Sequence, residues 1–226
     1  MIIAFMWCLI TVTIYLVSLH FYRKTKWSLL LPVFFSTLVI IMLLLVFDIP
    51  FSTYHSGGRF VDFFLGPAIV ALSFPLYAHR KRLLKILPTI FFWLTVASFL
   101  AMLSGTFLLW LFDVRLDLIT SMLLRNTTAA IAIELAHMYG GIASFTAALC
   151  TISGMIGAIM GPYIFKKAKI ETVLAKGISM GAIAHAIGTA RLMEFDDEAG
   201  AISTLSFLLM AIVATCLTPL FLWFYS

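Results

Sequence analysis

One segment of the sequence combines the composition of a membrane helix with side chains that can bind a polar molecule. It runs from Lys176 to Ala201 and closes on an acidic run at 194–198. Its polar groups and glycines are Gly177, Gly181, His185, Gly188, Thr189 and Arg191. Ionisable groups at membrane depth are costly and usually face a cavity or a partner, and glycines let backbones approach closely. We therefore expect this segment to contact any small polar molecule that the protein handles.

Two of these side chains suggest specific chemistry. The planar guanidinium of Arg191 can hold a carboxylate through two parallel hydrogen bonds, and His185 can relay a proton or donate to a substrate. The two residues are six positions apart, or more than one and a half turns of an unbroken helix, so only a break at Gly188 would bring them together. The alternatives are an interfacial Arg191 that pairs with Glu194 or a lipid phosphate, and a structural His185.

A second segment, 118–139, is also polar for its depth. Its polar side chains are Arg125, Asn126, Thr127, Thr128, Glu134 and His137. The first four supply one fixed charge with amide and hydroxyl groups. This set suits a small oxyanion bound at a helix start, and the alternative is a loop tip at the headgroup level. Glu134 and His137 share a helical face and can exchange a coupling proton or form a structural pair.

The composition requires a membrane protein. Of the 226 residues, 63% are hydrophobic and 11% are charged, whereas a soluble domain would carry roughly a quarter of charged residues. Apolar runs without strand-like alternation predict an all-α polytopic protein with about seven or eight membrane segments of ~20 residues each. The chain is then a single integral membrane domain, 1–226, with a first half up to 112 and a second half from 118.

The sequence offers no basis for an enzyme. It contains no nucleophile–base pair, phosphate-binding loop or metal-ligand spacing, so we expect neither catalytic residues nor a metal or organic cofactor. Cys8, Cys150 and Cys216 all fall in apolar runs and are expected to be small hydrophobic residues. The net charge of +5 comes from basic clusters between apolar runs, which indicate cytoplasmic loops rather than a nucleic-acid surface.

These clusters predict the topology, because basic loops are retained inside. The clusters at 23–26, 79–85 and 166–176 are then cytoplasmic, and the loops at 48–62, 113–117 and 194–198 are external. The N-terminal run has no small-residue cleavage site and is expected to be a retained span of the cytoplasmic (inner) membrane with an external N-terminus. The predicted segments are 2–19, 28–47, 63–77, 88–112, 118–139, 141–165, the segment from Lys176, and 200–224.

Two segments are expected to be irregular. Segment 118–139 must start and end on the same side, because 141–165 crosses from an external to a cytoplasmic loop, so we predict a re-entrant hairpin. Segment 63–77 is interrupted by Gly66-Pro67 and Phe74-Pro75 and is expected to be kinked or broken. Segments two to four and the last three then run in opposite senses, each with an interrupted middle member. This pattern predicts two inverted repeats around a transport site.

Several stretches resemble the LrgB/CidB family, and together they cover nearly the whole chain. They are Leu65-Gly-Pro-Ala-Ile-Val-Ala-Leu-Ser-Phe-Pro-Leu-Tyr77, Gly140-Gly-Ile-Ala-Ser-Phe-Thr-Ala147, Gly154-Met-Ile-Gly-Ala-Ile-Met-Gly-Pro162, Lys176 to Arg191, and Glu198-Ala-Gly-Ala201. The string Ala184-His-Ala-Ile-Gly-Thr-Ala-Arg191 is highly specific. Where the family typically reads Pro-Lys-Ser-Val-Thr-Thr-Pro-Ile-Ala, this chain has Leu124-Arg-Asn-Thr-Thr-Ala-Ala-Ile-Ala132, which keeps the basic charge and hydroxyls but neither proline.

The resemblance implies two functions. One is transport of small monocarboxylates such as pyruvate or glycolate, and the other is a holin-like or antiholin-like role that modulates murein hydrolase activity and cell lysis. The polar, interrupted segments favour the transporter, because a lysis pore needs little more than amphipathic or lipid-facing helices. The expected partners are a small membrane subunit of the LrgA/CidA type, a small carboxylate and the lipid bilayer. A homo-oligomer is left open, and no nucleic acid is expected.

Overall fold

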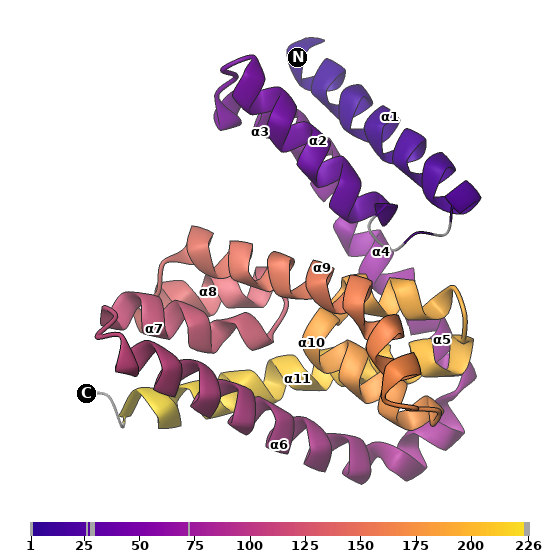
Figure 1. Ribbon diagram of the computed structural model, residues 1–226, viewed down its shortest axis with the longest axis vertical. Coiled ribbons are helices and arrows are strands. Elements are labelled where there is room, and N and C mark those ends of the chain that lie inside the picture. Colours follow the sequence, from indigo (N-terminus) through magenta and orange to yellow (C-terminus); the bar gives the residue numbers. More distant parts are fainter. Residues whose placement is uncertain (1, 26, 28–29, 72, 224–226) are drawn as a thin grey trace. The chain divides into compact units, whose positions relative to one another are not determined.

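The computed structural model describes residues 2–25, 27, 30–71 and 73–223, and all the regular structure in these ranges is helical. The protein is an all-α polytopic membrane protein, as predicted. By length and composition, five of the described helices can cross a membrane, and two shorter apolar helices accompany them. The chain divides into two compact units, Met1–Phe74 and Pro75–Ser226 (Figure 1).

The first unit contains α1 (Ile2–Thr25), α2 (Pro32–Val46), α3 (Phe51–Asp62) and α4 (Leu65–Ala71), and α1 packs against α2 and α3. The expectation of a loop at 48–62 is wrong, because residues 51–62 form α3. This helix is held by its packing: a Cβ at Gly57 would lie 2.6 Å from the Ala4 carbonyl oxygen, and the rings of Tyr54 and Trp7 meet edge to face. Lys26, at the end of the first basic cluster, and residue 224, at the end of the last predicted span, lie outside the described residues.

The described parts of the segment at 63–77 form two short helices, α4 and α5 (Ser73–Ala78). Residue 72, between them, lies outside the described residues, so the predicted break stays a prediction. Pro67 stands in the first turn of α4, where a missing backbone N–H removes no helical hydrogen bond. It therefore starts a helix here instead of kinking one.

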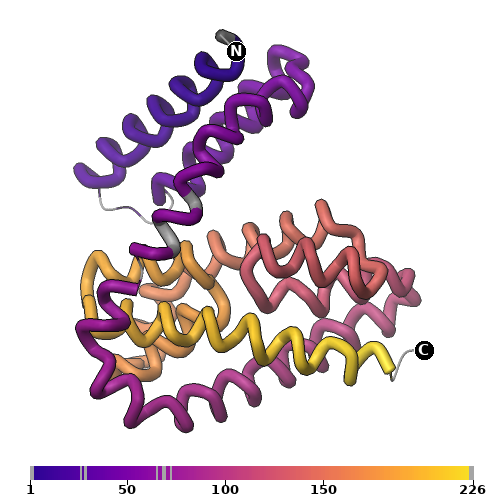
Figure 2. The backbone as a smooth tube through the Cα atoms, turned by 180° about the vertical axis from the view of Figure 1, so that it is seen from behind, coloured from indigo at the N-terminus to yellow at the C-terminus, as the bar shows by residue number. Residues whose placement is uncertain are grey.

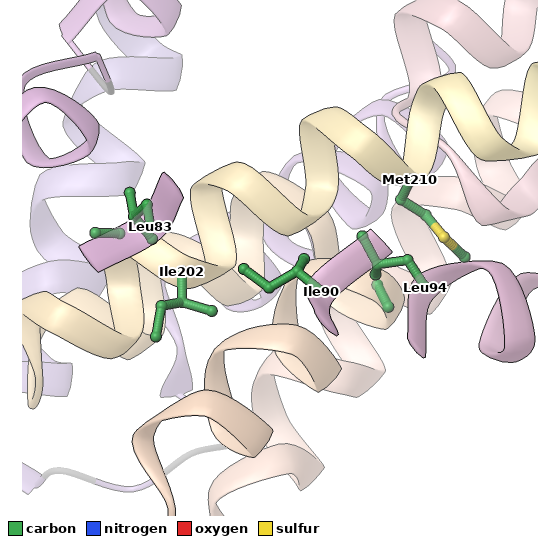
Figure 3. Close-up of a cluster of buried hydrophobic side chains, with 7 residues drawn as sticks. Leu83, Ile90, Leu94, Ile202 and Met210 are labelled. Carbon is green, nitrogen blue, oxygen red and sulfur yellow. The ribbon is translucent and has the colours of Figure 1, made fainter. Parts of the chain in front are cut away.

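The second unit is built on three long helices, α6 (Arg80–Leu111), α9 (Ala143–Lys167) and α11 (Asp197–Trp223). Helices α6 and α11 lie side by side in both views (Figures 1 and 2). Near their starts Leu83 and Ile202 share one apolar cluster, and further along both helices the ring centroids of Phe99 and Phe221 are 5.4 Å apart. The two helices therefore run parallel. The first cluster is completed by Ile90, Leu94, Ala182, Ala201 and Met210 (Figure 3).

A helical hairpin follows α6, as predicted for residues 118–139. Helix α7 (Leu116–Leu123) leads into a single 3₁₀ turn, η2 (Leu124–Asn126), and α8 (Ala129–Tyr139) returns. The hairpin is tied to the start of α9, because the Ser121 hydroxyl of α7 accepts a hydrogen bond of 2.8 Å from the backbone N–H of Ile142, the residue that precedes α9. We refer to α7, η2 and α8 as the first hairpin.

Helix α10 (Val173–Met193) is also a hairpin, which the sequence analysis did not predict. His185 interrupts it with φ 47° and ψ −134°. A Cβ at Gly188 would lie 3.2 Å from the Met180 carbonyl oxygen, whereas eight residues of straight helix span about 12 Å. Both arms also meet Ser203: a Cβ at Gly181 would lie 2.5 Å from its carbonyl oxygen, and the Thr189 hydroxyl lies 2.7 Å from its hydroxyl. We call α10 the second hairpin.

The second hairpin corrects the predicted topology. The break lies at His185, not at Gly188, and the chain returns to the end from which it came. Residues 166–176 and 194–198 are therefore at the same end of the unit, and an ion pair between Arg82 and Glu198 adds the start of α6 to that end. The prediction that residues 166–176 and 194–198 lie on opposite sides of the membrane is therefore wrong. The number of apolar residues in a segment does not show whether its glycines let it fold back.

The predicted senses of the last three segments are wrong for the same reason, so the inverted repeat inferred from them loses its basis. A different inverted pair is present within the second unit. The close contacts of Gly154 with Ala184 and of Gly161 with Met180 show that α9 runs antiparallel to the first arm of α10. The pair formed by α6 and the first hairpin and the pair formed by α9 and the second hairpin thus run in opposite directions. The two hairpins enter the unit from opposite ends.

Candidate functional site

The tip of the first hairpin, around η2, and the tip of the second hairpin, around His185, meet beside α9. We call this place the junction of the tips. At the first tip, the Cys150 thiol of α9 lies 3.5 Å from the Arg125 carbonyl oxygen. One turn further along α9, a Cβ at Gly154 would lie 3.4 Å from the carbonyl oxygen of Ala184, at the second tip. The His185 imidazole interacts with the backbone of Asn126, which joins the tips directly. Polar segments that are far apart in the sequence are thus brought together inside the unit.

Three buried polar atoms at this junction have no hydrogen-bond partner within the described part of the chain. They are the amide nitrogen Nδ2 of Asn126, the hydroxyl Oγ1 of Thr127 and the imidazole Nε2 of His185. Buried polar groups in proteins are nearly always paired, because an unpaired one costs about 1–3 kcal/mol. Three such atoms at one junction can all hydrogen-bond a polar ligand, and all can donate.

Arg125 supplies the positive charge of the first tip. Its side chain is half-buried, and the guanidinium NH2 would lie 3.9 Å from a Cβ at Gly105 of α6. Thr128 follows in an extended conformation as the N-cap of α8, with no hydrogen bond from its side chain to the helix. The N–H groups of the first turn of α8 therefore point toward the junction, where their partial positive charge favours an anion.

Thr189 and Gly188 position the returning arm of the second hairpin. The Thr189 hydroxyl donates to the His185 carbonyl oxygen at 2.8 Å and pairs with the Ser203 hydroxyl of α11. Gly188 leaves room for Met180 of the first arm. Ser203 and Cys150 were not among the predicted site residues. Each is an ordinary small residue in an apolar span, and no sequence signal separates it from its neighbours.

Arg191 lies away from the junction. It is only 6% exposed, it forms an ion pair with Glu194, and its guanidinium lies over the Phe195 ring at 4.4 Å from the centroid. Six helical residues separate it from His185, or about 9 Å along the axis. The pairing with Glu194 was one of the two alternatives left open by the sequence. The structure does not bring Arg191 together with Arg125.

Glu134 and His137 lie on the exposed side of α8. The buried side of the same helix carries Ala132, Leu135 and Ala136. Within the described residues the ion pairs do not include Glu134 with His137, and neither side chain contacts the junction of the tips. These two residues therefore face the surroundings of the second unit.

Known proteins are similar to this chain over nearly its full length. The LrgB-like family matches residues 11–224. The chain belongs to the LrgB-like family. Uncharacterized protein YxaC of Bacillus subtilis (strain 168) is 32% identical over 223 residues, which are 99% of this chain and 97% of that protein. Holin-like protein CidB of Staphylococcus aureus (strain Mu50 / ATCC 700699) is 32% identical over 223 residues, 98% of this chain and 97% of that protein.

Another relative of this chain, uncharacterized protein YwbG of Bacillus subtilis (strain 168), is 30% identical over 215 residues, 95% of this chain and 96% of that protein. No solved structure matches the chain. The family assignment thus rests on sequence, and the paired hairpins described above give this LrgB-like protein its structural description.

Proposed function

We propose that this LrgB-like protein is a secondary transporter of small monocarboxylates of the pyruvate or glycolate kind in the cytoplasmic membrane. The observation that carries the proposal is the set of three unpaired polar atoms, from Asn126, Thr127 and His185, where the two hairpin tips meet. Broken helices whose ends converge between inverted elements are the usual construction of a transporter site near the bilayer midplane.

A small carboxylate matches the chemistry of the junction. The Asn126 amide, the Thr127 hydroxyl and a protonated His185 Nε2 can donate to its oxygens, and Arg125 and the start of α8 supply positive potential. In this proposal Thr128, Gly188 and Thr189 position the two tips, and Arg191 holds the base of the second hairpin with Glu194 and Phe195. Because the hairpins enter from opposite ends, withdrawal of either one would open the site to one side at a time.

Proton coupling by Glu134 and His137 is part of the proposal under one condition. Ionisable side chains on an exposed helix face are costly in lipid, so another protein must cover this face of α8. A small membrane subunit of the LrgA/CidA type is the proposed partner. By the positive-inside rule, the end that carries Arg82, Lys167 and Lys176 is proposed to be cytoplasmic, which leaves the N-terminus external.

The test is uptake of radiolabelled pyruvate and glycolate into proteoliposomes, with and without the small subunit and an imposed proton gradient. Saturable uptake that unlabelled carboxylate inhibits is expected. Thr127→Val removes one donor without changing the shape of the side chain and should lower uptake about tenfold, the effect of losing one hydrogen bond to a charged ligand. Thr215→Val is the matched control, because the Thr215 hydroxyl bonds only the Ala211 carbonyl oxygen among its described contacts.

A holin-like role is the second candidate, and the name of the Staphylococcus aureus relative, holin-like protein CidB, is the observation that favours it. A pore of this kind would release unrelated dyes and sugars from the same proteoliposomes at similar rates. Leakage without saturation, together with normal behaviour of Thr127→Val, would exclude the transporter and leave the holin-like role.

A further inference from the structure

A cavity of about 450 Å³ opens at the base of the second hairpin, away from the junction of the tips. Its charged walls include Lys166 at the end of α9, Lys169 in the following turn and Lys176 in the first arm of α10. Its apolar floor includes Phe165 and Phe195. The cavity thus combines three cationic groups from separate parts of the chain with a surface that can cover carbon atoms.

The three lysines are available to a ligand. The ion pairs formed by the described residues, Arg82–Glu198, Arg115–Asp117 and Arg191–Glu194, involve none of them. Of the two carboxylates in the wall, Asp196 already accepts hydrogen bonds from the backbone N–H groups of Glu198 and Ala199, at 3.1 and 3.0 Å.

Glu171 is the one wall carboxylate without such an assignment, and it is exposed. The cavity wall therefore carries three ammonium groups against two carboxylates, and one of the two carboxylates is already held by backbone N–H groups. Ammonium groups act as point charges that bind phosphate oxygens well.

We propose that this cavity binds the phosphate group of an anionic phospholipid headgroup or of a soluble phosphorylated metabolite. Both sources present the same group, and basic pockets between membrane helices are known to hold anionic headgroups. The phosphate lies among Lys166, Lys169 and Lys176, and the glycerol or sugar carbons rest on Phe165 and Phe195.

The position of the cavity gives this ligand a role. Lys176 belongs to the first arm of the second hairpin, and Leu192 in the same wall belongs to the returning arm. A ligand that contacts both arms at once holds them together at the base and thereby stabilises the closed hairpin. Binding is independent of the substrate site, so this inference can fail while the transport proposal stands, and the reverse.

The test measures binding of dioleoyl phosphatidylglycerol to the purified full-length protein in micelles by native mass spectrometry, with dioleoyl phosphatidylcholine as the neutral comparison. Lys166, Lys169 and Lys176 are changed together to Gln. The matched control changes Lys81, Lys85 and Lys167 to Gln, which removes the same charge from the same end of the unit outside the cavity. Each lysine near a membrane surface contributes about fivefold to the affinity for an anionic lipid, so the cavity variant should bind roughly a hundredfold more weakly.

The outcomes separate the alternatives. Equal weakening in the two triple variants, or equal affinity of the wild type for both lipids, would overturn the site and leave a diffuse basic surface. Glycerol 3-phosphate that displaces the lipid, with the same dependence on the three lysines, identifies a soluble phosphate as the ligand, and failure to displace it identifies the lipid. Lys169→Gln alone, in an exposed turn, should weaken binding about fivefold and gives the answer if the triple variant does not fold.

Discussion

Both hairpins of the second unit reverse the direction of the chain, but they do so with different backbone conformations. The first turns through η2 and two extended residues, Thr127 and Thr128, all in ordinary conformations. The second turns at a single residue, His185, whose positive φ is rare for a side chain of this kind. Residues 116–139 contain no glycine, whereas Gly177, Gly181 and Gly188 are distributed over both arms of the second hairpin.

The difference separates two roles. Both arms of the second hairpin are anchored by close contacts with α9 and α11, and this anchoring is what allows the strained His185 conformation to persist. The first tip has no such strain, and it carries two of the three unpaired polar atoms and the arginine. The first hairpin thus supplies most of the binding groups, and the second supplies a rigid surface with one imidazole.

The largest expected effect concerns the end at which the second hairpin begins and ends. Lys167→Cys and Asp197→Cys should both react with an impermeant thiol reagent from the cytoplasmic side, and Asp113→Cys should react from the outside, each all-or-none. These variants are made in a background that lacks the native cysteines, and labelling is read in right-side-out and inverted vesicles. Reaction of Lys167→Cys and Asp197→Cys from opposite sides would show that α10 crosses the membrane and has no fold-back.

The next largest effect is expected from a β-branched side chain at each tip, which should change the stability of the two hairpins differently. His185→Val places a branched side chain at positive φ and should lower the free energy of unfolding by about 3 kcal/mol. Thr127→Val occupies extended backbone and should leave stability unchanged. Thermal unfolding of both variants in the same detergent measures the contrast, and equal melting temperatures would remove the proposed difference in strain.

The glycine contacts of the second hairpin should give a smaller effect. Gly181→Ala would place a Cβ 2.5 Å from the Ser203 carbonyl oxygen, and the two helices must separate, at a cost of about 2 kcal/mol. Gly66→Ala is the matched control, because nothing lies within 4 Å of its Cβ position, and it should be neutral or slightly stabilising. Chemical unfolding of the two variants tests this, and a stable Gly181→Ala would mean that the arms are loosely packed.

The smallest effect is expected at the base of the second hairpin. Arg191→Lys keeps a cation beside Glu194 and loses part of the contact with the Phe195 ring, which contributes about 0.5–1 kcal/mol. Uptake should stay within about twofold of the wild type, because the side chain contacts no substrate in this proposal. Arg125→Gln, at the first tip, should remove most uptake with normal abundance. The opposite order would return Arg191 to the substrate site.

The sequence revealed the class of protein and the first hairpin, but not the second. Polar residues at 118–139 stand out against a strongly apolar background, and the charges of the flanking loops required the chain to reverse there. At 173–193 the charges of the flanking loops wrongly indicated a membrane crossing, because a segment of 21 residues is long enough to cross the bilayer. Whether it crosses depends on Gly177 and Gly181 meeting α11 and on Gly188 meeting the first arm of the same hairpin, and these contacts are not visible in the segment's own composition.

The candidate site shows the same limit. Arg125 to Thr128 and His185 could be selected by residue type alone, since each is expensive inside a membrane. Arg191 fits the same criterion, yet the cost of burying its charge is offset by contacts with Glu194 and Phe195, three and four residues further along the chain. The contributions of Cys150 and Ser203 come from helix packing and have no compositional signature.

The fold-back of α10 also bears on how the protein is made and how its topology can be mapped. During synthesis residues 173–193 leave the ribosome before α11 does, and by length and composition they can cross a membrane. Gly177 and Gly181 have nothing to contact until Ile202 and Ser203 have followed them into the bilayer. A reporter enzyme fused after residue 193 should therefore be carried to the external side by an extended segment and misreport its position. In a fusion after residue 223, α11 is present and both arms of the second hairpin can pack against it.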